Sequence, residues 1–429
     1  MSEIQSEWKY EKRRYFILVL LGLFTATNFY QHYEFSAITN VVSKFYNISA
    51  TNVNWTSLLY NIGSVIMFYP IMKCIESFGF RTTTILVTFA NAIGPAIKCM
   101  SLQSNAYGIL LLGQTFPAFV TIVMPSLAAL FAAVWFKSEH VAFVISSNIV
   151  FLNFGSAAAF LSPSILFSGD KNNLKILRGL SLISVVLVLI TSAIFVLSVV
   201  VVREKPQSPP SVAQWVREKQ KSNKSWSELF ANKNFILLTI IFSMILALSQ
   251  TLSVILNQSI LAQFPNGNRI VTIAGILSLI PAMFSSPLMG FICKKCKKYK
   301  MMLIVSSFLV TISMSFYTLF VYLKSELMIY TFIFLTGFFY SGVYVLAMDF
   351  IVEVTYPYSE GITINTATLI ACLPAILLLP LTSSLITKYG STAGNFALLA
   401  SSALNFLISF FVDEDLRRMK ANLECIPLL

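Results

Sequence analysis

The sequence of 429 residues is poor in charged side chains. Asp, Glu, Lys and Arg together make up 11% of it, whereas a soluble globular domain carries about 25%. Hydrophobic residues account for 56%, and phenylalanine alone occurs 37 times. A water-soluble fold of this length could not cover so much apolar surface. The composition therefore excludes a soluble globule and predicts a protein whose solvent is the lipid bilayer.

Residue types that carry catalysis or bind metals are also scarce. His32 and His140 are the only histidines, and the six cysteines are scattered. Cys293 and Cys296 form a single CxxC pair among lysines, without a second pair or a histidine partner, so we expect neither a metal site nor a disulfide framework. The phosphate-binding motif GxxxxGK[ST] is absent, which excludes ATP as the source of energy. We expect no enzyme and no cofactor.

Long apolar segments fill most of the chain. A transmembrane helix needs about 20 mainly apolar residues, and twelve segments meet this requirement. They lie near residues 15–37, 53–74, 82–102, 106–134, 140–166, 177–202, 234–262, 268–293, 301–323, 327–352, 361–386 and 391–412. The sequence thus predicts an all-α integral membrane protein with twelve transmembrane helices.

Lysine and arginine accumulate in the loops on one side of these segments. They cluster in 1–14, in 203–233, in 294–300 and in 414–429, and the loop at 171–178 is the exception on the other side. Positive charge marks the cytoplasmic side, so both termini are expected there. The net charge of +12 is then an orientation signal, and we expect no nucleic-acid partner. The membrane itself is left open between the plasma membrane and an endolysosomal membrane.

The polar central loop is the clearest boundary in the chain. It divides the sequence into a cytoplasmic N-terminus (1–14), a six-helix bundle (15–202), the loop (203–233), a second six-helix bundle (234–413) and a cytoplasmic tail (414–429). This layout resembles the major facilitator superfamily. The resemblance implies a secondary transporter, or solute carrier, that works by alternating access around a site between its halves.

The loop after the second segment carries a candidate gate. Glu76, Gly79 and Arg81 resemble the superfamily pattern acid-x-x-Gly-x-basic. A carboxylate there can pair with a basic residue or with a helix terminus, and glycine permits the tight turn. An ordinary capped turn is the alternative. Asp349 and Glu353, one helical turn apart near the cytoplasmic end of the tenth segment, are expected to make gate or capping contacts.

Several short stretches carry a finer resemblance. They resemble the family of the feline leukaemia virus subgroup C receptor (FLVCR), which is a haem and choline transporter family. The stretches lie at 45–49 with Trp55 downstream, 113–114, 124–126, 160–163, 349–361 and 415–422. The resemblance implies a small-molecule substrate, either choline or ethanolamine, or haem.

The resemblance also implies where a choline site would lie. Choline carriers of this family hold the quaternary ammonium with aromatic side chains of the first and seventh segments, through cation–π attraction. The matching positions are His32 and Gln250, with Cys372 in the eleventh segment and Gln114 or Ala118 in the fourth. The aromatic cage is therefore missing, and an amino acid, a nucleobase or another polar metabolite remains an alternative solute.

The first segment is unusually polar for a transmembrane helix. Helical spacing puts Asn28, Gln31 and His32 on one face and turns Tyr30 and Glu34 away from it. Polar groups inside a membrane span indicate either a functional site or hydrogen bonds between helices. We predict a substrate site lined by Asn28, Gln31, His32, Gln114, Asn153, Gln250 and Cys372.

Glu34 is a separate case. It lies towards the external end of the first segment, where it attracts a cation at the entrance, carries a coupling proton or simply reaches water.

Two peripheral motifs concern processing and location. Asn47 begins an N-glycosylation sequon in the first external loop. The C-terminus has the acidic dileucine pattern of Glu424, Leu428 and Leu429, a sorting signal that trafficking adaptors read. A non-transporting membrane receptor would fit both motifs and is the alternative of another class, although it leaves the polar first segment without a task.

Overall fold

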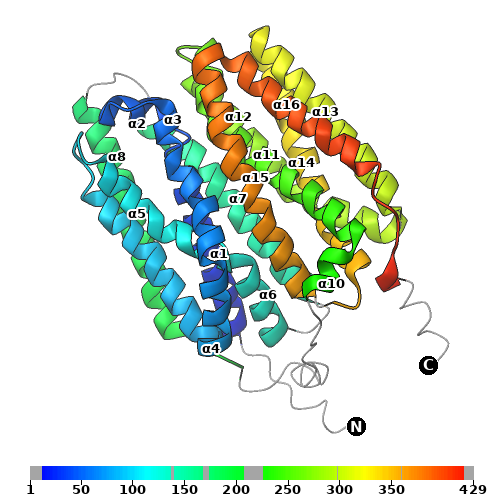
Figure 1. Ribbon diagram of the computed structural model, residues 1–429. Helices are drawn as coiled ribbons and strands as arrows, with labels where there is room; N and C mark the ends of the chain where they lie inside the picture. Colours follow the sequence, from blue (N-terminus) through cyan, green and yellow to red (C-terminus); the bar gives the residue numbers. More distant parts are fainter. Residues whose placement is uncertain are drawn as a thin grey trace, which may run out of the picture.

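The structure is a computed structural model, and it describes residues 12–136, 140–167, 173–206, 226–296, 298–358 and 360–419. The regular structure of this part of the chain is helical throughout (Figure 1). Its helices are α1 (Arg13–Tyr33), α2 (Thr39–Tyr46), α3 (Ala50–Val53), α4 (Trp55–Cys99), α5 (Tyr107–Val120), α6 (Val123–Trp135), α7 (Val141–Leu166), α8 (Asn173–Val201), α10 (Trp226–Ala231), α11 (Lys233–Gln263), α12 (Asn268–Cys296), α13 (Tyr299–Tyr322), α14 (Glu326–Thr355), α15 (Glu360–Tyr389) and α16 (Ser391–Ser409).

Helix α4 contains two passes through the bundle. A continuous helix of its 45 residues would be about 68 Å long, roughly twice the thickness of the hydrocarbon core. Gly79 interrupts it with φ 75° and ψ −173°, a conformation open to glycine because it has no Cβ. Conversely, α5 and α6 together make one pass. With these assignments each half of the chain crosses the bundle six times.

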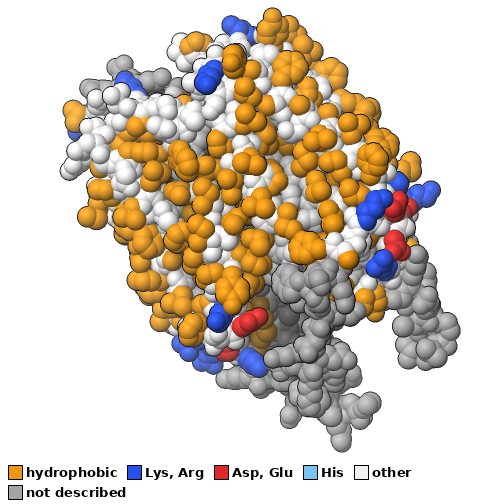
Figure 2. Space-filling model, in the orientation of Figure 1, with side chains coloured by type: hydrophobic (Ala, Val, Ile, Leu, Met, Phe, Trp, Pro, Cys, Tyr) orange, Lys and Arg blue, Asp and Glu red, His pale blue; other side chains and the backbone are white. Residues whose placement is uncertain are grey.

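The surface of the bundle is suited to lipid. Among the described residues, ten segments are long and apolar enough to cross a membrane. One of them, Ala50–Cys99, holds the two passes of α4, and the polar α1 adds the remaining pass, which is consistent with twelve. Hydrophobic side chains cover the broad middle of the molecule, and charged side chains gather at its ends (Figure 2). Exposed apolar residues such as Leu377, 74% exposed, have lipid as their solvent. The prediction of a multi-pass membrane protein is confirmed.

The two halves pack side by side (Figure 1). Helices α1 to α8 form one half and α11 to α16 the other, and the halves meet where α7 lies against α12 and α4 against α15. Phe160 and Leu58 of the first half are part of the hydrophobic core of the second. We call the end that carries α2 and α3 the α2 end, and the opposite end, where α1 and α11 begin, the α10 end.

Small residues set the distance between α1 and α7. A Cβ atom at Gly155 would overlap the backbone carbonyl of Ala26 on the neighbouring helix. Such close approach lets helices pack tightly where lipid gives no hydrophobic drive for association. The position of α1, which carries most of the predicted site, therefore depends on this glycine.

We predict that Gly155→Ala lowers the melting temperature of the purified protein in detergent, because overpacking a tight contact costs about 1–3 kcal/mol. Gly290→Ala is the matched control, since a Cβ at Gly290 meets nothing within 4 Å. Equal melting temperatures for the two variants would contradict the assigned contact.

Candidate substrate site and gates

Amide side chains tie the last turns of α1 to its neighbours. Asn28 donates through Nδ2 to Asn91 Oδ1 (3.0 Å) and to the carbonyl of Pro117 (2.8 Å), and its Oδ1 accepts from Thr121 (2.9 Å). Gln31 donates through Nε2 to the same Asn91 oxygen (3.1 Å). Asn28 and Gln31 thus bridge helices, the alternative that the sequence left open. In the described part of the chain, Gln31 Oε1 is buried without a hydrogen-bond partner.

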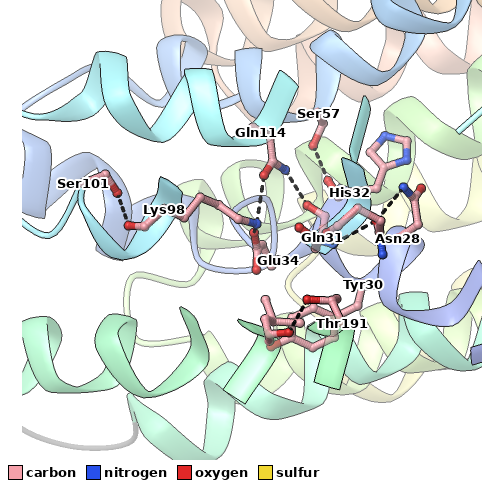
Figure 3. A network of polar contacts seen from close by, with 12 residues as sticks. Asn28, Tyr30, Gln31, His32, Glu34, Ser57, Lys98, Ser101, Gln114 and Thr191 are labelled. Atoms are coloured by element: carbon pink, nitrogen blue, oxygen red, sulfur yellow. Dashed lines mark hydrogen bonds and ion pairs between the residues drawn. The ribbon is translucent and has the colours of Figure 1, made fainter. Parts of the chain in front are cut away.

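A buried ion pair continues this network (Figure 3). Lys98 pairs with the carboxylate of Glu34 and donates to Gln114 Oε1 (3.1 Å). The two charged side chains are 1% and 2% exposed. Gln114 in turn donates through Nε2 to the backbone carbonyl of Gln31 (2.5 Å). The chain of contacts therefore joins α4, α5 and the end of α1.

The alternative that Glu34 simply reaches water is wrong, because the side chain is 2% exposed; its roles in cation entry or proton coupling stay predictions. Its carboxylate is buried because Lys98, 64 residues further along the chain, supplies the opposite charge that makes burial possible. Tyr30, in contrast, does turn away from the other polar residues of α1, and its hydroxyl is 2.6 Å from that of Ser162.

His32 lies between two tyrosine rings. Its ring centroid is 4.4 Å from that of Tyr33 and 4.2 Å from that of Tyr60, at interplanar angles of 10° and 2°. Parallel rings at these distances cover both faces of the imidazole. Its two nitrogens are buried and have no hydrogen-bond partner among the described residues. The backbone carbonyl of His32 accepts from Ser57 Oγ (2.8 Å), which fixes the end of the helix beneath the ring.

Gln250 lies on the face of α11 that is turned to the first half. On the same helix, Asn257 donates to the carbonyl of Ala37 (2.9 Å) and to Asn40 Oδ1 (3.1 Å). Seven residues are close to two helical turns, so Gln250 shares that face, about 10 Å deeper. In the first half, His32 precedes Ala37 by five residues. His32 therefore also lies deeper in the bundle than the contact between Ala37 and Asn257. Gln250 Oε1 is buried and lacks a partner in the described chain.

Cys372 and Tyr60 also lie where the halves meet. The Cys372 thiol on α15 contacts Ser64 of α4 and donates to the carbonyl of Thr368 (3.5 Å). Ser64 is one helical turn from Tyr60, so both occupy the face of α4 that meets α15. Tyr60 is the site residue that sequence reasoning missed, since an isolated tyrosine in an apolar span has no distinguishing pattern.

Asn153 is placed differently from the other predicted site residues. It is 6% exposed and donates through Nδ2 to the carbonyl of Ile149 (3.0 Å), one turn earlier in its own helix α7. This contact stays within one helix and does not join Asn153 to the network of α1.

Uncharged side chains join the halves at the α2 end. Asn40 donates through Nδ2 to Asn268 Oδ1 (3.2 Å), next to its contact with Asn257. Asn54 donates to Ser383 Oγ (2.9 Å) and to Gln258 Oε1 (3.4 Å). These amides and hydroxyls form the α2-end gate. Their partners lie more than 200 residues away in the chain, so the sequence offered no signal for these pairs.

Glu204 caps the helix that begins after Gly79. Its two carboxylate oxygens accept from the backbone N–H groups of Phe80 (2.8 Å) and Arg81 (2.7 Å). We expected Glu76 to provide the carboxylate of this turn. Glu204, which follows the sixth pass, takes this place because it reaches two free helix N–H groups, whereas Glu76 is exposed. A gate contact of Glu76 stays a prediction.

The second half repeats this arrangement. Glu414, which follows the twelfth pass, accepts from the backbone N–H of Lys300 (3.3 Å) at the start of α13. Asp349 accepts from the Tyr299 hydroxyl (2.8 Å), and Glu353 accepts from the N–H of Met419 (3.1 Å). The acid that the loop at 294–300 lacks is therefore supplied by the segment after the last pass.

The peripheral motifs fall partly outside the described residues. Asn47 is exposed and ends α2 with φ 53°, whereas Asn54, in the neighbouring sequon, is 3% exposed and hydrogen-bonded. Modification of Asn47 stays a prediction. The sorting residues Glu424, Leu428 and Leu429 lie outside the part of the chain that the structure describes.

Two six-pass halves that pack side by side are typical of a helical membrane transporter. The model of the Major Facilitator Superfamily matches residues 14–379, and the chain belongs to this family. It is a secondary transporter. Solved structures with the same fold include a D-xylose-proton symporter (TM-score 0.75, 13% identity, 93% of this chain and 98% of that chain) and a bacterial homologue of the human lysosomal transporter Spinster, in an inward-facing, unoccupied conformation (TM-score 0.68, 14% identity, 94% and 96%).

The chain is also similar to FLVCR proteins, as the short stretches of sequence implied. The choline/ethanolamine transporter FLVCR2 of Rattus norvegicus is 28% identical over 423 residues, which cover 96% of this chain and 77% of the rat protein. The choline/ethanolamine transporter FLVCR1 of Felis catus is 28% identical over 417 residues, 96% of this chain and 74% of the cat protein.

We predict that Glu34→Gln and Lys98→Met each lower the stability of the protein by about 3–5 kcal/mol, because each leaves the partner charge buried and unpaired. The double variant is expected to recover most of this loss. Thermal melting of the four proteins in detergent measures the coupling. Losses that simply add in the double variant would contradict a direct interaction between the two side chains.

We predict that Glu204→Ala speeds hydrogen exchange of the backbone amides of Phe80 and Arg81, because both lose their acceptor; loss of a helix cap costs about 0.5–2 kcal/mol. Hydrogen exchange read by mass spectrometry on peptides from this region is the measurement. Glu414→Ala is the matched control, which should affect the start of α13 instead. Unchanged exchange at residues 80 and 81 in Glu204→Ala would refute the cap.

Proposed function

We propose that this transporter moves a small organic amine, of the choline and ethanolamine class that its relatives carry, by alternating access. The solute lies at the interface of the halves, against His32 and Tyr60 on one side and Gln250 and Cys372 on the other. Asn28, Gln31 and Gln114 hold α1 in position behind the site.

The unsatisfied edge of His32 is the observation that carries this proposal. A buried polar atom without a hydrogen bond costs about 1–3 kcal/mol, and His32 buries two such atoms. A fold keeps such a group where something else completes its hydrogen bonds. The same holds for Gln250 Oε1, which faces the first half from a comparable depth. A bound solute with polar hydrogens satisfies the acceptor nitrogen of His32 and Gln250 Oε1, and an oxygen on the solute accepts from the His32 N–H.

The gates support alternating access. Neutral hydrogen bonds join the halves at the α2 end. Towards the α10 end, Ser126 of α6 donates to Asn365 Oδ1 of α15 (3.2 Å), while the carboxylate caps stay within each half. We infer that the α10 end is cytoplasmic, since Arg13, Arg203 and Lys233 lie there. The described conformation is then closed towards the outside. The transporter resides in the plasma membrane or an endolysosomal membrane, and its tail binds trafficking adaptors.

We predict that His32→Ala lowers the initial rate of solute uptake into proteoliposomes at least about tenfold, which corresponds to about 1.4 kcal/mol, because the site loses its central polar group. Uptake of labelled choline, ethanolamine, haem, pyridoxine, amino acids and nucleobases by the unmodified protein first identifies the solute.

Tyr30→Phe is the matched control for this variant. It changes the same helix but removes a hydroxyl that faces Ser162, away from the proposed site. Uptake by His32→Ala equal to that by Tyr30→Phe would contradict the site. Transport of no amine by a correctly folded protein that carries another solute of the panel would contradict the proposed solute class.

A further inference from the structure

The stacking of His32 decides which of its surfaces a solute can use. A quaternary ammonium has no N–H group and binds aromatic rings through their faces. Both faces of the His32 ring are covered, by Tyr33 and by Tyr60. Only the edge of the ring remains, and this edge offers hydrogen bonds in the plane of the imidazole. The position therefore recognises polar hydrogens and not a positively charged methyl surface.

The unsatisfied atoms of the proposed site include hydrogen-bond acceptors from both halves. A neutral imidazole has one acceptor nitrogen and one N–H donor, and a glutamine side-chain oxygen is an acceptor with two lone pairs. The buried atoms without partners are the two nitrogens of His32 and Gln250 Oε1. A primary ammonium carries three N–H donors and no acceptor. Its donors match the acceptor nitrogen of His32 and Gln250 Oε1 in kind, and one hydrogen is left for a water molecule or the solute's own oxygen.

The Tyr60 hydroxyl adds a hydrogen-bond donor to these acceptors. It too is buried without a partner among the described residues, and a phenol both donates and accepts. Tyr60 stacks on His32 and lies on the face of α4 that meets α15. A hydroxyl on the solute, a short distance from its ammonium group, complements this position.

The bundle contains one primary ammonium group of its own, which is bound by side-chain oxygen atoms. The Lys98 ammonium is buried and bound by the carboxylate of Glu34 and the side-chain oxygen of Gln114, and it also lies over the Phe35 ring, 5.4 Å from the ring centroid. Oxygen acceptors take its hydrogen bonds, and one aromatic ring adds a cation–π contact. Because Lys98 neutralises Glu34, this pair leaves no net charge of its own beside the site.

We propose that the site discriminates by the number of N–H groups on the amine, so that a primary amino alcohol is preferred to its quaternary, fully methylated form. This inference rests on the proposed function, since it concerns the same site. Each added methyl group removes one N–H donor. The first takes the spare hydrogen, and the second and third take the donors to His32 and Gln250, while each methyl group adds volume at the edge of the His32 ring.

The test is a methylation series on the full-length protein. Uptake of labelled ethanolamine into proteoliposomes is measured with N-methylethanolamine, N,N-dimethylethanolamine and choline as competitors, and binding is followed by the melting temperature in detergent. We expect inhibition and stabilisation to fall from the primary to the quaternary amine, with ethanolamine at least about tenfold more potent than choline.

His32→Phe tests the role of the ring edge directly. Phenylalanine retains an aromatic ring between Tyr33 and Tyr60 but has no nitrogen. We expect the variant to lose at least about tenfold in affinity for ethanolamine and little for choline, so that the ratio of the two falls towards one. Tyr30→Phe, the control on the same helix, should keep the ratio of the unmodified protein.

The outcomes separate this inference from the proposed function. Choline equal to or more potent than ethanolamine, or a selectivity ratio unchanged in His32→Phe, overturns the inference while amine transport stands. Neither binding nor uptake of any member of the series, by a protein that still melts cooperatively, overturns the proposed function and the inference with it.

Discussion

The buried pair of Lys98 and Glu34 is the interaction on which the arrangement of the first half depends. Isolated charges are not stable inside an apolar bundle, and each of these two needs the other. Their contact brings α4 to the end of α1, and Gln114 extends it from α5 to the backbone of Gln31. Three passes thereby converge where α1 ends. His32, the next residue, takes its place from this convergence and from Ser57.

The two ends of the molecule are held by different chemistry. At the α10 end, carboxylates from the segments after the sixth and twelfth passes cap the helices that begin at residues 80 and 299. These contacts stay within each half and preserve its shape. At the α2 end, amides and hydroxyls connect one half with the other. A half that moves as a rigid unit keeps its carboxylate caps. It must break and re-form the amide and hydroxyl contacts that join it to the other half.

Hydropathy and charge predicted the architecture because these signals are local. Twelve apolar segments, the turn at Gly79 and the polar face of the first segment can each be read from consecutive residues. The partners of these residues could not be predicted, since contact between Lys98 and Glu34 spans 64 residues and that between Glu204 and Phe80 spans 124. For the same reason the local motif of Glu76, Gly79 and Arg81 pointed to Glu76, whereas the carboxylate that caps residues 80 and 81 comes from Glu204. Tyr60 was missed because stacking depends on ring orientation, which no spacing encodes.

The neutrality of the α2-end gate has a consequence for how the transporter responds to its surroundings. Opposite charges at a surface are screened by salt over about 8 Å at physiological ionic strength, and charges that move through a membrane feel its potential. The α2-end gate contains neither kind of charge, since its side chains, such as Asn40, Asn257 and Asn54, are uncharged. Separation of the halves at this end breaks dipolar contacts only, so the gate itself responds weakly to ionic strength and to membrane voltage. A dependence of transport on ionic strength or on membrane voltage would then come from the charge of the transported solute.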